Sequence, residues 1–135
     1  MLHLADRYGG GPVQLTEIAD SQNIPPKFLT VMLSQMSREG LVGTRRGRDG
    51  GYWLARAPES ISYGELVRLT RGSIGLLPCA SRLAYESCSH CITEDKCRLH
   101  RVMLMVRDET ARILDGLTLA DPVPLDVPLE EQVHG

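Results

Sequence analysis

The chain has 135 residues, 42% of them hydrophobic and 24% charged, which predicts one globular domain, or one small domain with an accessory element. No apolar run reaches the length of a membrane span, and the opening MLHLADRYGG lacks the pattern of an export signal. We therefore expect a cytoplasmic protein with no membrane partner. The net charge of −2 excludes a wholly basic nucleic-acid binder and leaves only a local patch for that function.

The N-terminal part of the chain predicts three helices. The opening LHLAD predicts the last turns of a first helix, which the following glycines end. Thr16 is predicted as the N-cap of a second short helix that ends at Asn23. A Pro-Pro pair suits the start of a third helix, which Gly40 ends, and two short helices with a tight link predict a helix-turn-helix. The predicted inward face of the third helix consists of Phe28, Leu29, Met32, Leu33 and Met36.

Two strand-like runs, LVGTRR and GYWLA, are joined by the turn sequence GRDG, which predicts a β-hairpin. Arg45, Arg46 and Arg48 lie at or beside the tip of this hairpin, where their side chains are not expected to pack in the hydrophobic core. A helix-turn-helix followed by a basic hairpin predicts a winged helix, whose third helix enters the major groove while the hairpin lies along the backbone or minor groove. Lys27 and Thr30 are then predicted to approach base edges or phosphates. The alternative is a solvated turn whose arginines serve solubility.

Two further helices are predicted beyond the hairpin. Ser62 and Glu65 form a capping box that opens a helix ending at Gly72. Periodicity then fails over residues 73–97, and a long helix is predicted at 98–117. The apolar stripe of this long helix consists of Leu99, Val102, Met103, Val106, Ile113, Leu114 and Leu117. Such a lone helix needs a partner, and a second copy of the chain is the simplest one.

These elements predict a mainly α fold with a small β-hairpin wing. The winged helix-turn-helix domain is predicted to span residues 1–72, the cysteine-rich loop 73–97 and the dimerisation helix 98–117. The remaining segment, 118–135, contains three prolines within DPVPLDVP, and these disfavour both helix and sheet. This tail is therefore predicted to be disordered.

All four cysteines, Cys79, Cys88, Cys91 and Cys97, lie in one polar stretch with the spacing C-x8-C-x2-C-x5-C. In a reducing cytoplasm such a group is a metal site or a redox site more often than a disulfide staple. Zinc fits in part, because only Cys88 and Cys91 form the C-x2-C knuckle that structural zinc sites normally use twice. Iron–sulfur clusters accept looser spacings and usually take four thiolates. Zinc and a Cys88–Cys91 disulfide switch are the alternatives.

Cys97 immediately precedes the long predicted helix, where exposed N–H groups and the helix dipole favour a thiolate. His100 lies one helical turn further on, so it is an alternative ligand, a hydrogen-bond donor to the ligands, or a residue with no role in the site. The sequence contains no G-x-S-x-G, P-loop or H-E-x-x-H motif. We therefore do not expect an enzyme.

The stretch from LTEIADSQNIPPKFL to SYGELVRLTRG resembles the Rrf-type winged helix-turn-helix regulators, and its most specific part is the wing sequence RGRDGGY. The resemblance extends through CRLHRVMLMVRDETARILDGLTL, to about residue 120. This bacterial family includes the iron–sulfur cluster regulator IscR and the nitric-oxide-sensing repressor NsrR. The resemblance implies a homodimer that binds palindromic operator DNA and senses iron–sulfur status, nitric oxide or redox conditions through a cluster.

The family's cluster cysteines carry over onto Cys79, Cys91 and Cys97, and His100 matches the position where some members use a histidine ligand. Cys88 is an additional cysteine that many members lack. It is a candidate replacement for an acidic ligand that some members supply from residues before the position of Met1. The implied cofactor is a two-iron or four-iron cluster. A zinc-stabilised or thiol-based regulator, and a winged-helix adaptor that does not bind DNA, are the alternative functions.

Overall fold

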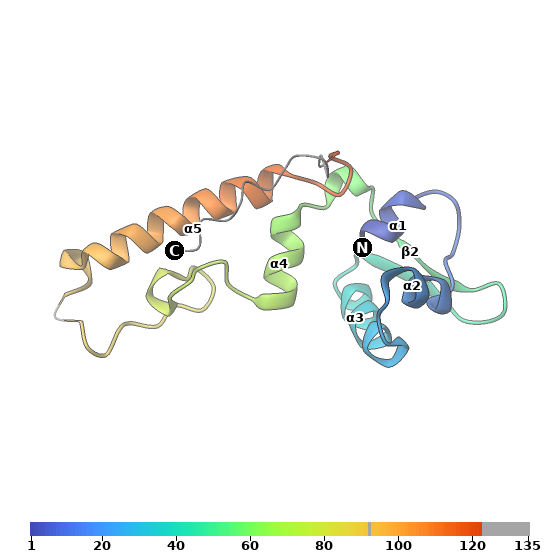
Figure 1. The fold of residues 1–135 in the computed structure, drawn as a ribbon, viewed down its shortest axis with the longest axis horizontal. Helices are drawn as coiled ribbons and strands as arrows, with labels where there is room; N and C mark the ends of the chain where they lie inside the picture. The colour runs from blue at the N-terminus through green and yellow to red at the C-terminus, as the bar shows by residue number, and fades with distance from the viewer. Residues whose placement is uncertain (92, 123–135) are drawn as a thin grey trace.

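The structure is a computed structural model that describes residues 1–91 and 93–122. Helices α1 (Leu2–Asp6), α2 (Leu15–Gln22) and α3 (Pro26–Arg38) precede a hairpin of β1 (Val42–Arg45) and β2 (Gly51–Leu54), and α4 (Tyr63–Arg71) and α5 (Arg98–Gly116) follow it. Short 3-10 turns occupy η1 (Pro58–Ser60), η2 (Pro78–Ala80) and η3 (Glu94–Lys96). Helices α1 to α3 and the hairpin lie at one end of the molecule, α5 occupies the other end, and α4 lies between them (Figure 1). The predicted fold class is confirmed.

The helix-turn-helix has its helix boundaries at the residues that the sequence predicts to end one helix and begin the next. Asn23 ends α2 in the left-handed conformation with φ 51°, and Pro26 occupies the first turn of α3. Leu29, Leu33 and Met36 are buried, as predicted. Phe28 is a correction, because its side chain is 62% exposed. It precedes Leu29 by one residue, which places it about 100° around the helix from the buried stripe.

Helix α2 begins two residues earlier than predicted, so Thr16 is not its N-cap. Gln14 occupies that position without a side-chain capping bond. Its amide donates instead to the carbonyl oxygens of Gly50, at 2.8 Å, and Arg48, at 3.2 Å, in the turn of the hairpin. A long-range hydrogen bond thus replaces the expected local cap, and it holds the wing against the start of α2.

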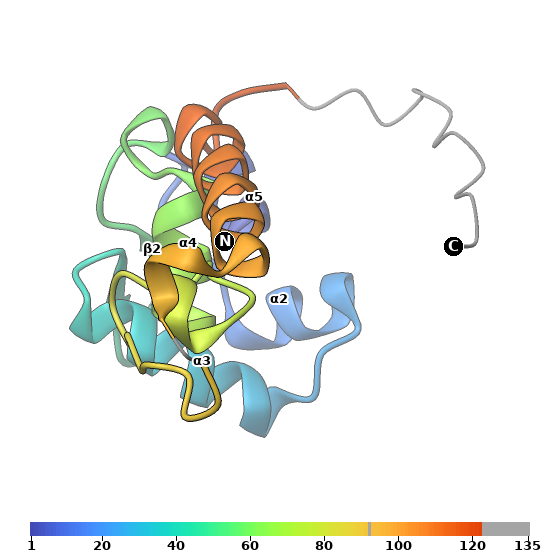
Figure 2. The same ribbon diagram turned by 90° about the vertical axis from the view of Figure 1, so that its left-hand side faces the viewer.

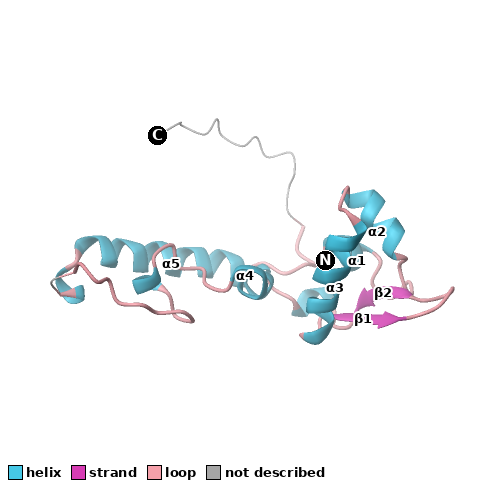
Figure 3. Cartoon of the chain, turned by 90° about the horizontal axis from the view of Figure 1, so that it is seen from below, coloured by secondary structure: helices cyan, strands magenta, loops and turns pink. Residues whose placement is uncertain are grey.

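The hairpin is antiparallel, with Val42 opposite Leu54 and Arg45 opposite Gly51. Val13 adds an isolated bridge to the edge of β2 that does not face β1. Its backbone N–H and carbonyl exchange hydrogen bonds of 2.8 and 2.9 Å with Tyr52. Gly51 has φ +145°, and a Cβ at this position would collide with the backbone of Val13. The base of the wing is therefore fixed to the domain core while its turn projects outward, away from α3 (Figure 3).

Helix α4 starts with half of the predicted capping box. The backbone N–H of Glu65 donates to Oγ of Ser62 at 3.1 Å, which confirms the cap. The Glu65 carboxylate pairs instead with Arg56 at 2.6 and 3.3 Å, because the guanidinium offers it two charged donors.

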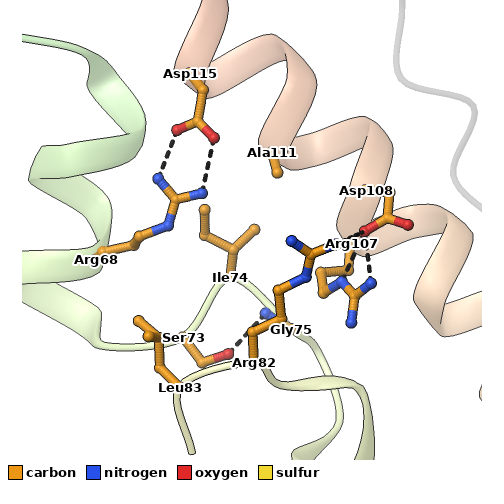
Figure 4. A pocket seen from close by; sticks show the side chains of 10 residues that line it. All are labelled: Arg68, Ser73, Ile74, Gly75, Arg82, Leu83, Arg107, Asp108, Ala111 and Asp115. Atoms are coloured by element: carbon orange, nitrogen blue, oxygen red, sulfur yellow. Dashed lines mark hydrogen bonds and ion pairs between the residues drawn. The ribbon is translucent and has the colours of Figure 1, made fainter.

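A forked ion pair joins α4 to α5. The guanidinium of Arg68 donates to both oxygens of Asp115, at 2.5 and 2.9 Å (Figure 4). Gly64 allows this approach, because a Cβ there would collide with the Asp115 carboxylate. Further along α5, Arg107 donates to the carbonyl of Ala80 at 3.1 Å, so α5 is also tied to η2. These contacts enclose a cavity of about 250 Å³ between the two helices and residues 73–83.

The apolar stripe of α5 divides into two parts. None of the residues of α5 is buried. Met103, Leu114 and Leu117 are half-buried against the chain's own elements. The outward-facing side chains, which are between 37% and 69% exposed, are Leu99, Val102, Met105, Val106 and Ile113.

Order extends beyond the predicted start of the tail at residue 118. Leu119 is 7% exposed and belongs to the core of the winged domain. Its N–H donates to the carbonyl of Ile61 at 3.0 Å, and the N–H of Tyr63 donates to Leu117 at 2.9 Å. The prediction of disorder therefore fails for these first tail residues, because a long-range apolar contact holds them. Residues 123–135 lie outside the described residues.

Replacing Leu119 with alanine should lower the free energy of unfolding by about 2–3 kcal/mol, because the change empties a buried site. Leu76→Ala is the matched control, since Leu76 is 70% exposed and its loss should cost less than about 0.5 kcal/mol. Urea denaturation followed by circular dichroism measures both. Equal midpoints for the two variants would show that the segment after α5 does not contribute to the core.

Candidate functional site

A polar groove of about 650 Å³ lies between α3 and the hairpin. Helix α3 lines it with the side that faces away from Leu29 and Leu33, so the same helix contributes one face to the core and the other to the groove. The groove residues with chemistry suited to DNA are Thr30, Ser34, Ser37 and Arg38 of α3 and Arg45 and Arg46 of the wing. Hydroxyl and guanidinium groups are the donors that contact phosphates and base edges.

The structure brings three of the five predicted DNA-contact residues together in this groove. Thr30, Arg45 and Arg46 line it, whereas Lys27 and Arg48 are exposed nearby on α3 and on the turn. The Arg45 guanidinium donates to the carbonyl of Asp49 at 2.8 Å, which stiffens the turn.

Sequence reasoning missed three residues of the groove, Ser34, Ser37 and Arg38. Their signal was available, because they continue the polar face of Thr30 at helical spacing. The roles of all these residues in DNA binding stay predictions.

The cysteine loop connects α4 to α5 and lies alongside the start of α5 (Figure 2, yellow). Cys79 in η2 and Cys97 are half-buried, whereas Cys88 and Cys91 are exposed. Cys97 is the N-cap of α5, as predicted, and its Sγ accepts a hydrogen bond from the His100 N–H at 3.4 Å. The start of α5 thus holds this sulfur in place.

Cys91 lies close enough to Cys88 and Cys97 for both to affect its ionisation. Hydrogen bonds from the backbone N–H of His90 and from the side chain of Cys91 lower the pKa of Cys88. The hydrogen bond that Cys91 donates to Cys88 raises the pKa of Cys91 to about 11, with smaller contributions from desolvation, from the charge of Cys88 and from Cys97. Thiolates are the usual ligands of zinc and of iron–sulfur clusters, so these side chains have the chemistry that either group would use.

Cys79 lies with two other potential ligands. One ligand atom each from Cys79, Glu94 and His100 lies within 4.8 Å of the others. Glu94 was not predicted, because a glutamate in a polar loop is an ordinary surface residue in sequence. The hydroxyl of Tyr85 donates to Glu94 at 2.5 Å, and this bond raises the pKa of Tyr85, with smaller contributions from Cys79 and Cys91.

Residues 1–124 match the family model of Rrf2, described as an iron-dependent transcriptional regulator. This chain belongs to the Rrf2 family. An rrf2-like HTH-type transcriptional regulator of Rhodobacter capsulatus is 40% identical over 124 residues, which cover 90% of this chain and 83% of that relative.

Two solved Rrf2-type structures share the fold. CymR, the global cysteine regulator of B. subtilis, has a TM-score of 0.67 and 29% identity over 87% of this chain and 82% of its own. IscR of T. potens has a TM-score of 0.65 and 31% identity over 89% of this chain and 74% of its own.

The comparisons confirm the predicted family, the winged-helix fold and the DNA-binding, transcription-regulating role of this Rrf2 protein. They also confirm that it is not an enzyme, because its relatives are transcriptional regulators. None of the described helices combines the length and apolarity needed to cross a membrane.

Proposed function

We propose that this Rrf2 regulator binds operator DNA as a homodimer and that an iron–sulfur cluster in the cysteine loop controls its DNA affinity. The observation that supports the cluster most strongly is the grouping of Cys88, Cys91 and Cys97 at the positive end of α5. Thiolates are the usual ligands of such clusters.

The proposed ligands are the four thiolates of Cys79, Cys88, Cys91 and Cys97, with His100 as the alternative ligand. When bound, the cluster supplies an iron centre that responds to oxidants, nitric oxide or iron supply. The chain's own contribution is to hold the thiolates. Ala80, next to Cys79, is fully buried, and the first turn of α5 fixes Cys97.

Homodimer formation is proposed through the outward side chains of α5. Leu99, Val102, Val106 and Ile113 follow one another at three-, four- and seven-residue steps, which is the spacing of a helix seam. A second copy of the same helix would cover them with an equivalent surface. The two winged domains would then present two α3 helices to the two halves of a palindromic operator.

Coupling between cluster and DNA is proposed to pass through the joint between α4 and α5. The loop of residues 73–97 starts after α4 and ends at α5, and Arg107 connects α5 to η2 within it. A change in the loop would therefore alter the angle between the winged domain and the dimer helix. Tenfold regulation of DNA affinity requires a difference of about 1.4 kcal/mol between the two arrangements.

The proposal as a whole is tested by purifying the protein without oxygen and measuring iron, sulfide and the visible spectrum. A brown protein with iron and acid-labile sulfide is expected, whereas a zinc-stabilised regulator would be colourless. Colourless protein that contains zinc and binds operator DNA would reject the cluster in favour of the zinc alternative.

Replacing Arg46 with alanine should weaken binding to operator and unrelated DNA alike, because the side chain lines the groove between α3 and the wing, where we propose that the phosphate backbone binds. The slope of log affinity against log salt concentration should fall by about one unit. Anisotropy titrations at several salt concentrations measure both quantities. The control is Arg112→Ala on α5, far from the groove; an Arg46 variant that behaves like it would remove the wing from the DNA interface.

A further inference from the structure

Cys79, Glu94 and His100 form a group of sulfur, oxygen and nitrogen donors that the thiol group of Cys88, Cys91 and Cys97 does not explain. The three donors come from separate elements: Cys79 from η2, Glu94 from η3 and His100 from the first turn of α5. Their ligand atoms lie within 4.8 Å of one another. We propose that these three side chains bind a single divalent cation of the zinc type when the loop holds no cluster.

The His100 ring supports a bound cation. Its side chain is 13% exposed, and Nδ1 is buried without a hydrogen-bond partner among the described residues. Nδ1 lies 3.4 Å from Oε1 of Glu94, which is within ion-pair distance, but the geometry is not that of a hydrogen bond. A buried nitrogen and a carboxylate oxygen that face each other in this way are stabilised by sharing a proton or a cation.

Two of the three donors, Glu94 and Cys79, are held by contacts outside the group. The hydroxyl of Tyr85 donates to Oε2 of Glu94, which leaves Oε1 toward His100. Arg107 fixes the backbone beside Cys79 through the carbonyl of Ala80. Such outer contacts orient ligands and strengthen metal binding.

The donor set selects the class of cation. Zinc binds thiolate, imidazole and carboxylate together, whereas magnesium and calcium prefer oxygen alone. Ligand atoms around tetrahedral zinc lie about 3.3–3.8 Å apart. Nδ1 of His100 and Oε1 of Glu94, at 3.4 Å, already have this spacing, so binding requires a shift of at most roughly 1 Å at Cys79. Three protein ligands leave a fourth position open to water or to another donor.

The proposal goes beyond the cluster, because it assigns a second metal-bound form to the same loop. It also predicts different effects of substitution at the two groups. Cys88 and Cys91 do not take part, although both are proposed cluster ligands. Glu94 takes part here and is not a proposed cluster ligand.

The experiment uses the full chain, freed of metal by a chelator without oxygen and titrated with Co²⁺ as the spectroscopic probe. Wild-type protein and the Cys88→Ser/Cys91→Ser double variant should each bind one Co²⁺ with similar affinity and show a sulfur-to-cobalt band and four-coordinate visible bands. Glu94→Gln and His100→Gln should each lower the affinity at least tenfold. Cys79→Ser should remove the sulfur-to-cobalt band. Circular dichroism checks that each variant is folded.

Two outcomes would overturn the proposal. The first is loss of Co²⁺ binding in the Cys88→Ser/Cys91→Ser variant, which would place the cation on the thiol group. The second is unchanged binding in folded Glu94→Gln and His100→Gln proteins. Neither outcome bears on the cluster, whose presence is measured separately as iron and sulfide in protein that has not been stripped.

Discussion

Replacing Cys97 with serine should abolish the visible absorption of the protein purified without oxygen and leave its fold intact. Cys97 is half-buried at the N-cap of α5, and its Sγ accepts a hydrogen bond from the N–H of His100. A serine hydroxyl still accepts the N–H of His100, because serine is a preferred N-cap residue, but it does not replace a thiolate ligand. Operator affinity should therefore equal that of wild-type protein stripped of its cluster.

Cys97→Ala separates the two roles of this residue. It should lose the cluster as the serine variant does and also lose about 1 kcal/mol of stability with the helix cap. Iron and sulfide analysis, urea denaturation and an operator titration measure the three quantities. A Cys97→Ser protein that retains its full iron and sulfide, or loaded and stripped wild-type proteins that bind operator equally, would contradict the sensing mechanism.

Replacing Val102 with aspartate should convert the protein to monomers and lower operator affinity by about a hundredfold or more. Val102 is 50% exposed in the middle of the outward stripe of α5, so a carboxylate there leaves the single chain folded. In a dimer the same carboxylate would face its own copy across an apolar seam, where charges are costly. The loss in DNA binding follows because two linked half-site contacts give avidity gains of about 10²–10⁴ over one.

The matched control is Arg112→Asp, which places the same carboxylate on α5 at a side chain that is 70% exposed and lies beside the seam of Leu99, Val102, Val106 and Ile113 but is not part of it. Its mass in solution and its operator affinity should stay near the wild-type values. Light scattering and anisotropy measure both properties. A Val102→Asp protein that remains dimeric would move the dimer interface away from this stripe.

Several starts and ends of helices could be predicted from the sequence, because they depend on residues close together in the chain. Asn23 adopts its left-handed conformation, Pro26 starts α3 and Ser62 caps α4, each through its own backbone or side-chain chemistry. The hairpin, the family and the concentration of cysteines before α5 were evident for the same reason. The polar face of α3 was only partly recognised, since Ser34 is unremarkable until the wing is seen beside it.

Long-range contacts were decided by the tertiary structure alone. Gln14 replaced Thr16 at the start of α2 because its amide reaches the wing turn. Leu119 is ordered because the core beneath it accepts an apolar side chain from a segment whose composition predicts disorder. Glu94 meets Cys79 and His100 only because η2, η3 and α5 converge. Local backbone preferences act over a few neighbouring residues, whereas these contacts join elements whose spacing along the chain does not determine their distance in space.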